Sequence, residues 1–187
     1  MNTLRLGLII FFAIHLLPSV KPLYAALKNK LGEKAFKGLF ALVSLAGMVL
    51  IVMGMGEAEF VDVYEPPSWG RHVTSLLMLF ALYGVIAAQM KFPTSIKTVS
   101  AHPMLWGITA WSTGHLLANG DLASVTMFGA FLIYSLFAMF SANQRGARPS
   151  AGPLTFKGDG IVLVITAVIY TLIMFFHASI AGVPIME

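Results

Sequence analysis

Long runs of apolar residues, separated by short polar stretches, follow one another along the whole chain. Six such runs lie at about residues 4–20, 38–56, 73–90, 103–118, 122–142 and 161–181. Runs of about this length with few or no charges are typical of helices that cross a bilayer. The pattern therefore predicts an all-α membrane protein: a polytopic bundle of about six transmembrane helices in one integral-membrane domain over residues 1–187.

The polar stretches carry signals for turns and helix ends. Pro18 predicts that the first helix ends or kinks where a lysine-rich segment begins, and that segment, 21–37, is expected to lie at a headgroup surface. Asn119 and Gly120 are residues that tolerate positive φ, and Asp121 can cap a following helix. The fourth and fifth helices are therefore expected to form an antiparallel hairpin.

Small residues are frequent in the second run. Gly47, Gly54 and Gly56, together with Ser44, lie within nineteen residues that carry no charge. Glycine and serine let two membrane helices approach closely, because they present almost no side chain at the contact. These positions predict close helix packing more than chemistry.

Composition supports the membrane class and removes several kinds of site. The chain is 58% hydrophobic and 11% charged, with a mean hydropathy of +0.83, far from the usage of soluble domains. It has no cysteine, which excludes disulfides, thiolate nucleophiles, cysteine-ligated zinc or iron–sulfur sites and thioether-linked haem. A bound metal would need histidine, carboxylate or methionine ligands.

The loop charges predict an orientation. Ten of the twelve Lys and Arg residues follow the first, third and fifth runs, and the other side has Arg5 and Arg71. Six of the eight acids lie on that other side: Glu57, Glu59, Asp62, Glu65, Asp121 and Glu187. By the positive-inside rule the basic loops are cytoplasmic and both termini are periplasmic. The net charge of +4 thus faces the headgroups of the lipid bilayer, and we expect no nucleic-acid partner.

Three histidines fall inside the apolar runs, at His15, His115 and His177. An imidazole in hydrocarbon needs partners for its nitrogens, so it is hydrogen-bonded, relays protons or binds a metal. No run contains an acid for a proton relay, and a haem needs only one or two neutral imidazoles in an apolar slot. The metal hypothesis that fits is b-type haem; histidines that only hydrogen-bond between helices are the open alternative. His72 and His102 are expected to be solvated at the two surfaces.

Several motifs resemble a known family. The run HLLANGDLAS extends from His115 to Ser124, and HPMLWG begins at His102. Similar segments are HLLP at 15–18, KAFKGLF at 34–40, and His177 ahead of Gly182-Val183-Pro184. Over nearly the whole chain these motifs resemble the NnrU family of bacterial inner-membrane proteins.

The resemblance implies a multi-pass protein of the bacterial inner membrane, associated with denitrification and nitric oxide metabolism. A relative of that family, the zeta-carotene isomerase of plants and cyanobacteria, uses b-type haem with two histidine ligands to convert a cis double bond to trans. Carried over by motif, those ligands fall on His15 and His115. The relative has an arginine where this chain has Ala101 and a cysteine where it has Ser112.

Helix counting places His115 and His177 at similar heights and His15 about 10 Å nearer the cytoplasmic side. Two ligands of one iron need their nitrogens about 4 Å apart on opposite faces of the metal. A first helix bent at Pro18 would close that gap, and His177 is expected to be a substitute ligand or a hydrogen-bond partner. Trp111, one turn from His115, is expected to line the pocket.

Three functions remain open. The favoured one is a haem-binding accessory or sensor protein, which binds nitric oxide or supports components of a respiratory nitric oxide reductase, because Ala101 and Ser112 depart from the isomerase pattern. The second is a haem-dependent cis-trans isomerase of a carotenoid-like, hydrophobic polyene. The third is a structural membrane protein without a cofactor. Whether the protein is an enzyme stays open.

Overall fold

The computed structural model describes residues 1–182 and 185, and within them the chain is helical. Val183 and Pro184 of the closing motif and the acid Glu187 lie outside the described residues. The elements are α1 Asn2–Leu16, η1 Leu17–Ser19, α2 Lys21–Leu31, α3 Glu33–Gly56, α4 Gly70–Gln89, α5 Ser95–Val99, α6 Pro103–Ala118, α7 Leu122–Gln144 and α8 Phe156–Ala181. The described part has no β-strand, which confirms the all-α prediction.

Five helical segments in the described residues are long and apolar enough to cross a membrane: α1 with η1, α3, α4, α7 and α8. The remaining predicted span, α6, has 16 residues and is about 24 Å long against a hydrocarbon core of about 30 Å. Helix length thus supports five of the six predicted spans. Both α3 and α8 begin earlier than predicted, because an apolar run marks the hydrocarbon part of a helix and misses its polar first turn.

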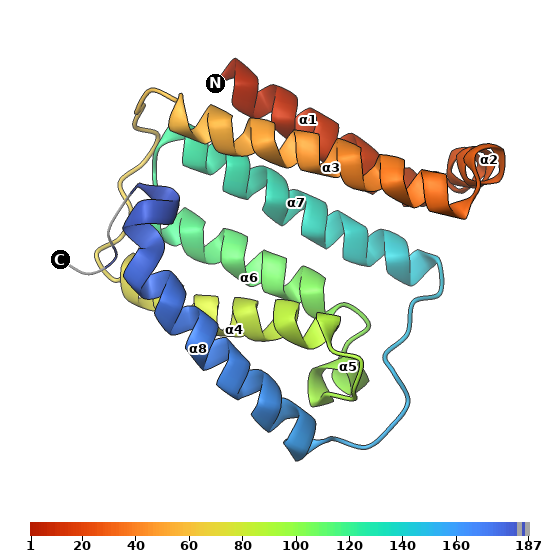
Figure 1. Cartoon of the computed structure of the whole chain (residues 1–187). Helices are drawn as coiled ribbons and strands as arrows, with labels where there is room; N and C mark the ends of the chain where they lie inside the picture. Colours follow the sequence, from red (N-terminus) through yellow and green to blue (C-terminus); the bar gives the residue numbers. More distant parts are fainter. Residues whose placement is uncertain (183–184, 186–187) are drawn as a thin grey trace.

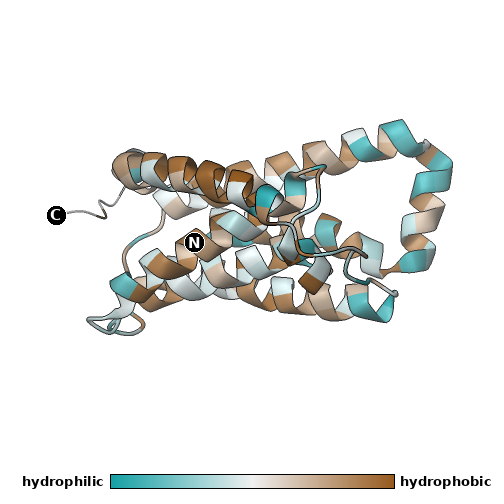
Figure 2. Ribbon diagram, turned by 90° about the horizontal axis from the view of Figure 1, so that it is seen from below, coloured by the Kyte–Doolittle hydropathy of each residue, from teal (hydrophilic) through white to brown (hydrophobic). Residues whose placement is uncertain are grey.

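The helices lie side by side, with α7 between the α1–α3 pair and the α6–α4 pair and α8 against α4 (Figure 1). The start of α1 and the end of α8 are at the same end of the bundle, and the basic helix α2 is at the other (Figure 1). Hydrophobic residues follow the helix lengths, whereas hydrophilic residues gather at the end that carries α2 (Figure 2). Apolar helices with polar residues toward their ends are typical of a membrane protein.

Glycines set the contact between α1 and α3. A Cβ at Gly54 would overlap the backbone of Leu4, and one at Gly47 would lie 2.8 Å from the backbone nitrogen of Phe11. Both distances forbid a side chain without helix movement, so two of the predicted contact glycines are confirmed. Around Gly56 there is open space instead.

Helices α4 and α6 pack antiparallel through a second set of glycines. A Cβ at Gly84 would lie 2.7 Å from the carbonyl oxygen of Pro103, and one at Gly107 would lie 2.6 Å from that of Ala81. The Thr74 hydroxyl also donates to the Gly114 carbonyl at 2.6 Å. Helix α6 is thus held backbone to backbone along α4.

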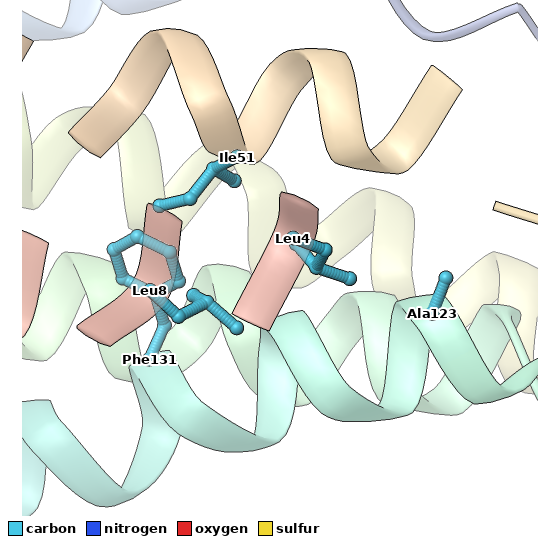
Figure 3. Close-up of a cluster of buried hydrophobic side chains, with 5 residues drawn as sticks. All are labelled: Leu4, Leu8, Ile51, Ala123 and Phe131. Carbon is cyan, nitrogen blue, oxygen red and sulfur yellow. The ribbon is translucent and has the colours of Figure 1, made fainter. Parts of the chain in front are cut away.

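The buried cluster at the acidic end joins three helices. Leu4 and Leu8 of α1, Ile51 of α3, and Ala123 and Phe131 of α7 meet there (Figure 3). Leu4 is fully buried. This cluster fixes the half of α1 that precedes His15 against α7.

The corner between α6 and α7 confirms the predicted hairpin and corrects its backbone. The Asp121 side chain accepts a hydrogen bond from the Ser124 N–H at 2.9 Å, as a helix cap does. The expected positive φ is wrong, because Asn119 has φ −133° and the positive-φ residues in the described part are glycines elsewhere. Gly120 is needed for space instead, since a Cβ there would overlap the carbonyl of Tyr64.

Candidate functional site

His115 lies in the last turn of α6, near the acidic end of the bundle. Its Nδ1 lies 2.9 Å from the carbonyl oxygen of Trp111, one turn earlier. The imidazole stacks on Phe128 of α7, with ring centroids 4.5 Å apart, and the Trp111 ring lies 5.3 Å away. Trp111 therefore contacts His115 from the preceding turn of the same helix, and its place in a haem pocket stays a prediction.

His15 occupies the matching position in the last turn of α1. Its Nδ1 lies 2.6 Å from the carbonyl oxygen of Phe11, and its ring stacks on the Phe11 ring at 4.1 Å. Edges of two further aromatic rings complete the pocket, from Phe40 of α3 at 5.1 Å and Tyr134 of α7 at 6.1 Å. The imidazole is thus half-buried between three helices.

The two imidazoles share one hydrogen-bond pattern. A carbonyl oxygen only accepts, so Nδ1 carries the proton in both His15 and His115. In the neutral ring this leaves the lone pair on Nε2, which is the tautomer and orientation found in histidines that ligate a metal. In this tautomer the Nε2 atom of each residue keeps an electron pair that it can donate.

The structure does not bring His15 and His115 into contact. Between them runs a series of ring contacts: Phe11 to Phe131 at 5.5 Å and Phe131 to Trp111 at 5.4 Å. Their partners on α7, Tyr134 and Phe128, are six residues apart, which is about 9 Å along a helix. This offset agrees with the height difference expected from helix counting.

The bend near Pro18 does not shift His15 toward His115. Helix α1 is regular to Leu16, and the change of direction begins with the short helix η1 at Leu17. His15 therefore precedes the bend and keeps the position that straight α1 gives it.

His177 lies on α8, and its imidazole is close enough to that of His115 for the two rings to interact electrostatically. Of the other two histidines, His72 is in the first turn of α4, at the same end of the bundle as His115, and His102 precedes α6 at the opposite end. His72 is exposed, and the His102 Nε2 is 2.7 Å from the Asn143 side-chain oxygen. The structure thus groups His115, Trp111 and His177 and leaves His15 across the aromatic series.

Within the described residues, no three histidine, cysteine, aspartate or glutamate side chains come together as a metal-binding group. A zinc or non-haem iron centre usually needs three or more such ligands. A haem iron requires one or two from the protein.

Sequence reasoning missed the aromatic face of α7, which carries Phe128, Phe131 and Tyr134. All three contact either a candidate histidine or an aromatic neighbour of one. Their spacing of three residues places them on one side of a helix, and that signal is present in the sequence.

A model of the NnrU protein family matches residues 3–185 of the chain. The chain belongs to the NnrU family. Comparisons with curated proteins and with solved structures found no match. Within this NnrU family member, three residues of the HLLANGDLAS run have a structural explanation. Its histidine faces Phe128, its glycine accommodates the Tyr64 carbonyl, and its aspartate caps α7.

Proposed function

We propose that this NnrU family member binds b-type haem within the membrane and acts as an accessory or sensor protein in nitric oxide metabolism and denitrification. His115 and His15 are the proposed ligands, and Trp111 and His177 line the haem. The observation that carries the proposal is the matched pattern at two membrane-embedded imidazoles, each with Nδ1 bonded to its own helix and Nε2 left as a donor to a metal.

The aromatic series between the two histidines supports an apolar, flat ligand. Phe131 is buried and belongs to the cluster of α1, α3 and α7, and half-buried Trp111 packs against that cluster. A haem would take the place of such rings, so its binding requires side chains between α1 and α6 to rearrange. When bound, haem would supply a one-electron couple, and release of one of the two histidines would open a position for a diatomic ligand such as nitric oxide.

The proposed location is the bacterial inner membrane, with both termini periplasmic. Ten basic side chains and two acidic ones lie at the α2 end of the bundle, which favours a cytoplasmic position for that end. We count α6 as a sixth, shorter membrane helix because α4 and α7 both pack along it. The proposed partners, components of a respiratory nitric oxide reductase, would meet this bundle in the same membrane.

The test is the absorption spectrum of the full-length protein, produced with ample haem and purified in mild detergent. We expect a Soret band in the oxidised and reduced states. His15→Ala and His115→Ala should each abolish or shift it, whereas His72→Ala and His102→Ala should leave it unchanged. A colourless protein contradicts haem binding. A band that survives His15→Ala and disappears in His177→Ala makes His177 the second ligand.

A further assay separates the accessory role from the isomerase hypothesis. A host that accumulates a cis carotenoid either regains the trans product when this protein is produced or does not. Ser112 stands where the isomerase has a cysteine, and its side chain is fully buried. We expect no isomerisation, and formation of the trans product would replace the accessory role with an enzymatic one.

A further inference from the structure

A groove of about 330 Å³ opens at the basic end of the bundle, between α5, the start of α6 and the segment that follows α7. Its polar lining residues are Lys97, Ser100, His102, Arg148 and Ser150. These come from two parts of the chain that are far apart in sequence. The groove is therefore a product of the fold and lies at the end opposite to His115.

Hydrogen bonds hold the two sides of the groove together. The Ser150 N–H donates to the carbonyl of Lys97 at 2.8 Å, and the His102 N–H donates to the Ser100 hydroxyl at 3.0 Å. The His102 Nε2 also lies 2.7 Å from the Asn143 side-chain oxygen at the end of α7. The lining is thus fixed by main-chain and side-chain bonds from α5, α6 and α7.

The charge of the groove is positive and unbalanced. Lys97 and Arg148 contribute two cations, and none of the lining residues is an acid. Among the described residues, Lys37 and Glu33 of α3 form an ion pair, which involves neither cation of the groove. Asp159, the other acid at this end, accepts from the Tyr83 hydroxyl and the Ser95 N–H at 2.8 Å each.

Both cations keep hydrogen-bond donors for a ligand. Lys97 donates once, to the carbonyl of Met90, and Arg148 donates once, to the carbonyl of Ala147. An ammonium group has three N–H donors and a guanidinium five. A tetrahedral anion with several acceptor oxygens matches this set, and phosphate is the common one in a membrane interface.

Apolar residues continue the groove along the bundle. Met104 lines it beside His102 and is 43% exposed. On the other side of His102 a second hollow of about 270 Å³ is lined by Trp106, which is 44% exposed. An exposed methionine beside two cations, with an exposed tryptophan in the adjoining hollow that shares His102, matches the junction between headgroup and acyl chain of a lipid.

We infer that this groove binds the phosphate group of an anionic phospholipid, with Lys97 and Arg148 on the phosphate and the acyl chains along Met104 and Trp106. The inference does not depend on haem binding. It differs from general attraction between a basic surface and an anionic membrane, because it assigns binding of the phosphate to two of the ten cations at this end.

The test is native mass spectrometry of the full-length protein in detergent, titrated with phosphatidylglycerol, phosphatidylcholine, oleate or inorganic phosphate. We expect phosphatidylglycerol to bind most tightly. The double variant Lys97→Gln/Arg148→Gln should weaken it by about tenfold or more. The matched variant Lys30→Gln/Lys34→Gln removes the same charge from exposed positions on α2 and α3 and should change binding less than twofold.

Each other outcome contradicts the inference. Equal losses in the two double variants would show unspecific electrostatics, and inorganic phosphate that displaces the lipid one for one would show a soluble phosphate ligand. Oleate that binds as tightly as phosphatidylglycerol would show that the phosphate is not recognised. The swapped variant Lys97→Arg/Arg148→Lys keeps both charges and should retain binding. It tests the inference even if the neutral double variant folds poorly.

Discussion

The hydroxyl of Tyr64 donates a hydrogen bond to the main-chain carbonyl of Asn119 at 2.9 Å, and it also contacts the carbonyl of Leu116. The backbone adds three bonds: Gly120 accepts from Val63 and Tyr64 at 2.9 and 3.2 Å, and the Leu122 N–H donates to the Val61 carbonyl at 2.8 Å. These bonds tie the acidic loop 57–69 to the corner that follows His115.

Tyr64→Phe should loosen this loop. Removal of the hydroxyl takes away a bond to a carbonyl at the end of α6, which is worth about 0.5 to 1.5 kcal/mol. We expect the free energy of unfolding to fall by that amount and amide exchange to accelerate in residues 57–69. Tyr24→Phe on α2 is the matched control. Unchanged exchange in the loop would show that the backbone bonds alone hold it.

Tyr64 should ionise at higher pH than a free tyrosine. Burial raises the pKa of its phenol, and the nearby Asp121 carboxylate raises it further. Since the folded pKa lies above the unfolded value of about 10, Tyr64 contributes stability that is complete below that pH and is lost as the pH rises through the folded pKa. The phenolate absorbance of the wild type minus that of Tyr64→Phe, followed against pH, measures the pKa of Tyr64. A midpoint at the pKa of a free tyrosine contradicts the expectation.

Gly54→Ala should disrupt the α1–α3 pair. The added methyl group overlaps the backbone of Leu4, and backbone cannot move aside as a flexible side chain does. We expect a loss of about 1 to 3 kcal/mol, typical of overpacking, measured by reversible unfolding in mixed micelles. Gly56→Ala is the control, because space is open around Gly56. Equal stability of the two variants would place the helix contact elsewhere.

Ser112→Ala should leave the protein as stable or make it more stable. The Ser112 hydroxyl is fully buried in α6 and finds no hydrogen-bond partner among the described residues. An unsatisfied buried hydroxyl is destabilising by about 1 to 3 kcal/mol, and alanine removes it. Thermal unfolding measures the change. A clear loss of stability would mean that a bound water or ligand satisfies this oxygen.

The apolar runs predicted most helices because each long run must bury its backbone polar groups in hydrogen bonds, whatever its neighbours are. Their ends were less predictable. The polar first turns of α3 and α8 are helical although they carry Glu33 and Asp159. Gly120 is in a turn, as predicted, but positive φ is not the reason. The carbonyl of Tyr64 lies too close for a side chain at this position.

The candidate site was predictable only in part. His115 and Trp111 are four residues apart on one helix, so local spacing was enough to place them together. The position of His15 depends on how α1 packs against α3 and α7, and spacing within α1 carries no information on that. The Lys97–Arg148 groove likewise needs α5 and the segment after α7 to meet, which no local pattern indicates.

Helix α6 is shorter than the helices that flank it. Its neighbours α4 and α7 have 20 and 23 residues against its 16, a difference of about 6 to 10 Å along the axis. If α6 spans the membrane as proposed, we expect a bilayer matched to the longer helices to be thinner beside it. At the Pro103 end of α6 such thinning would place lipid headgroups at the level of His102 and Lys97.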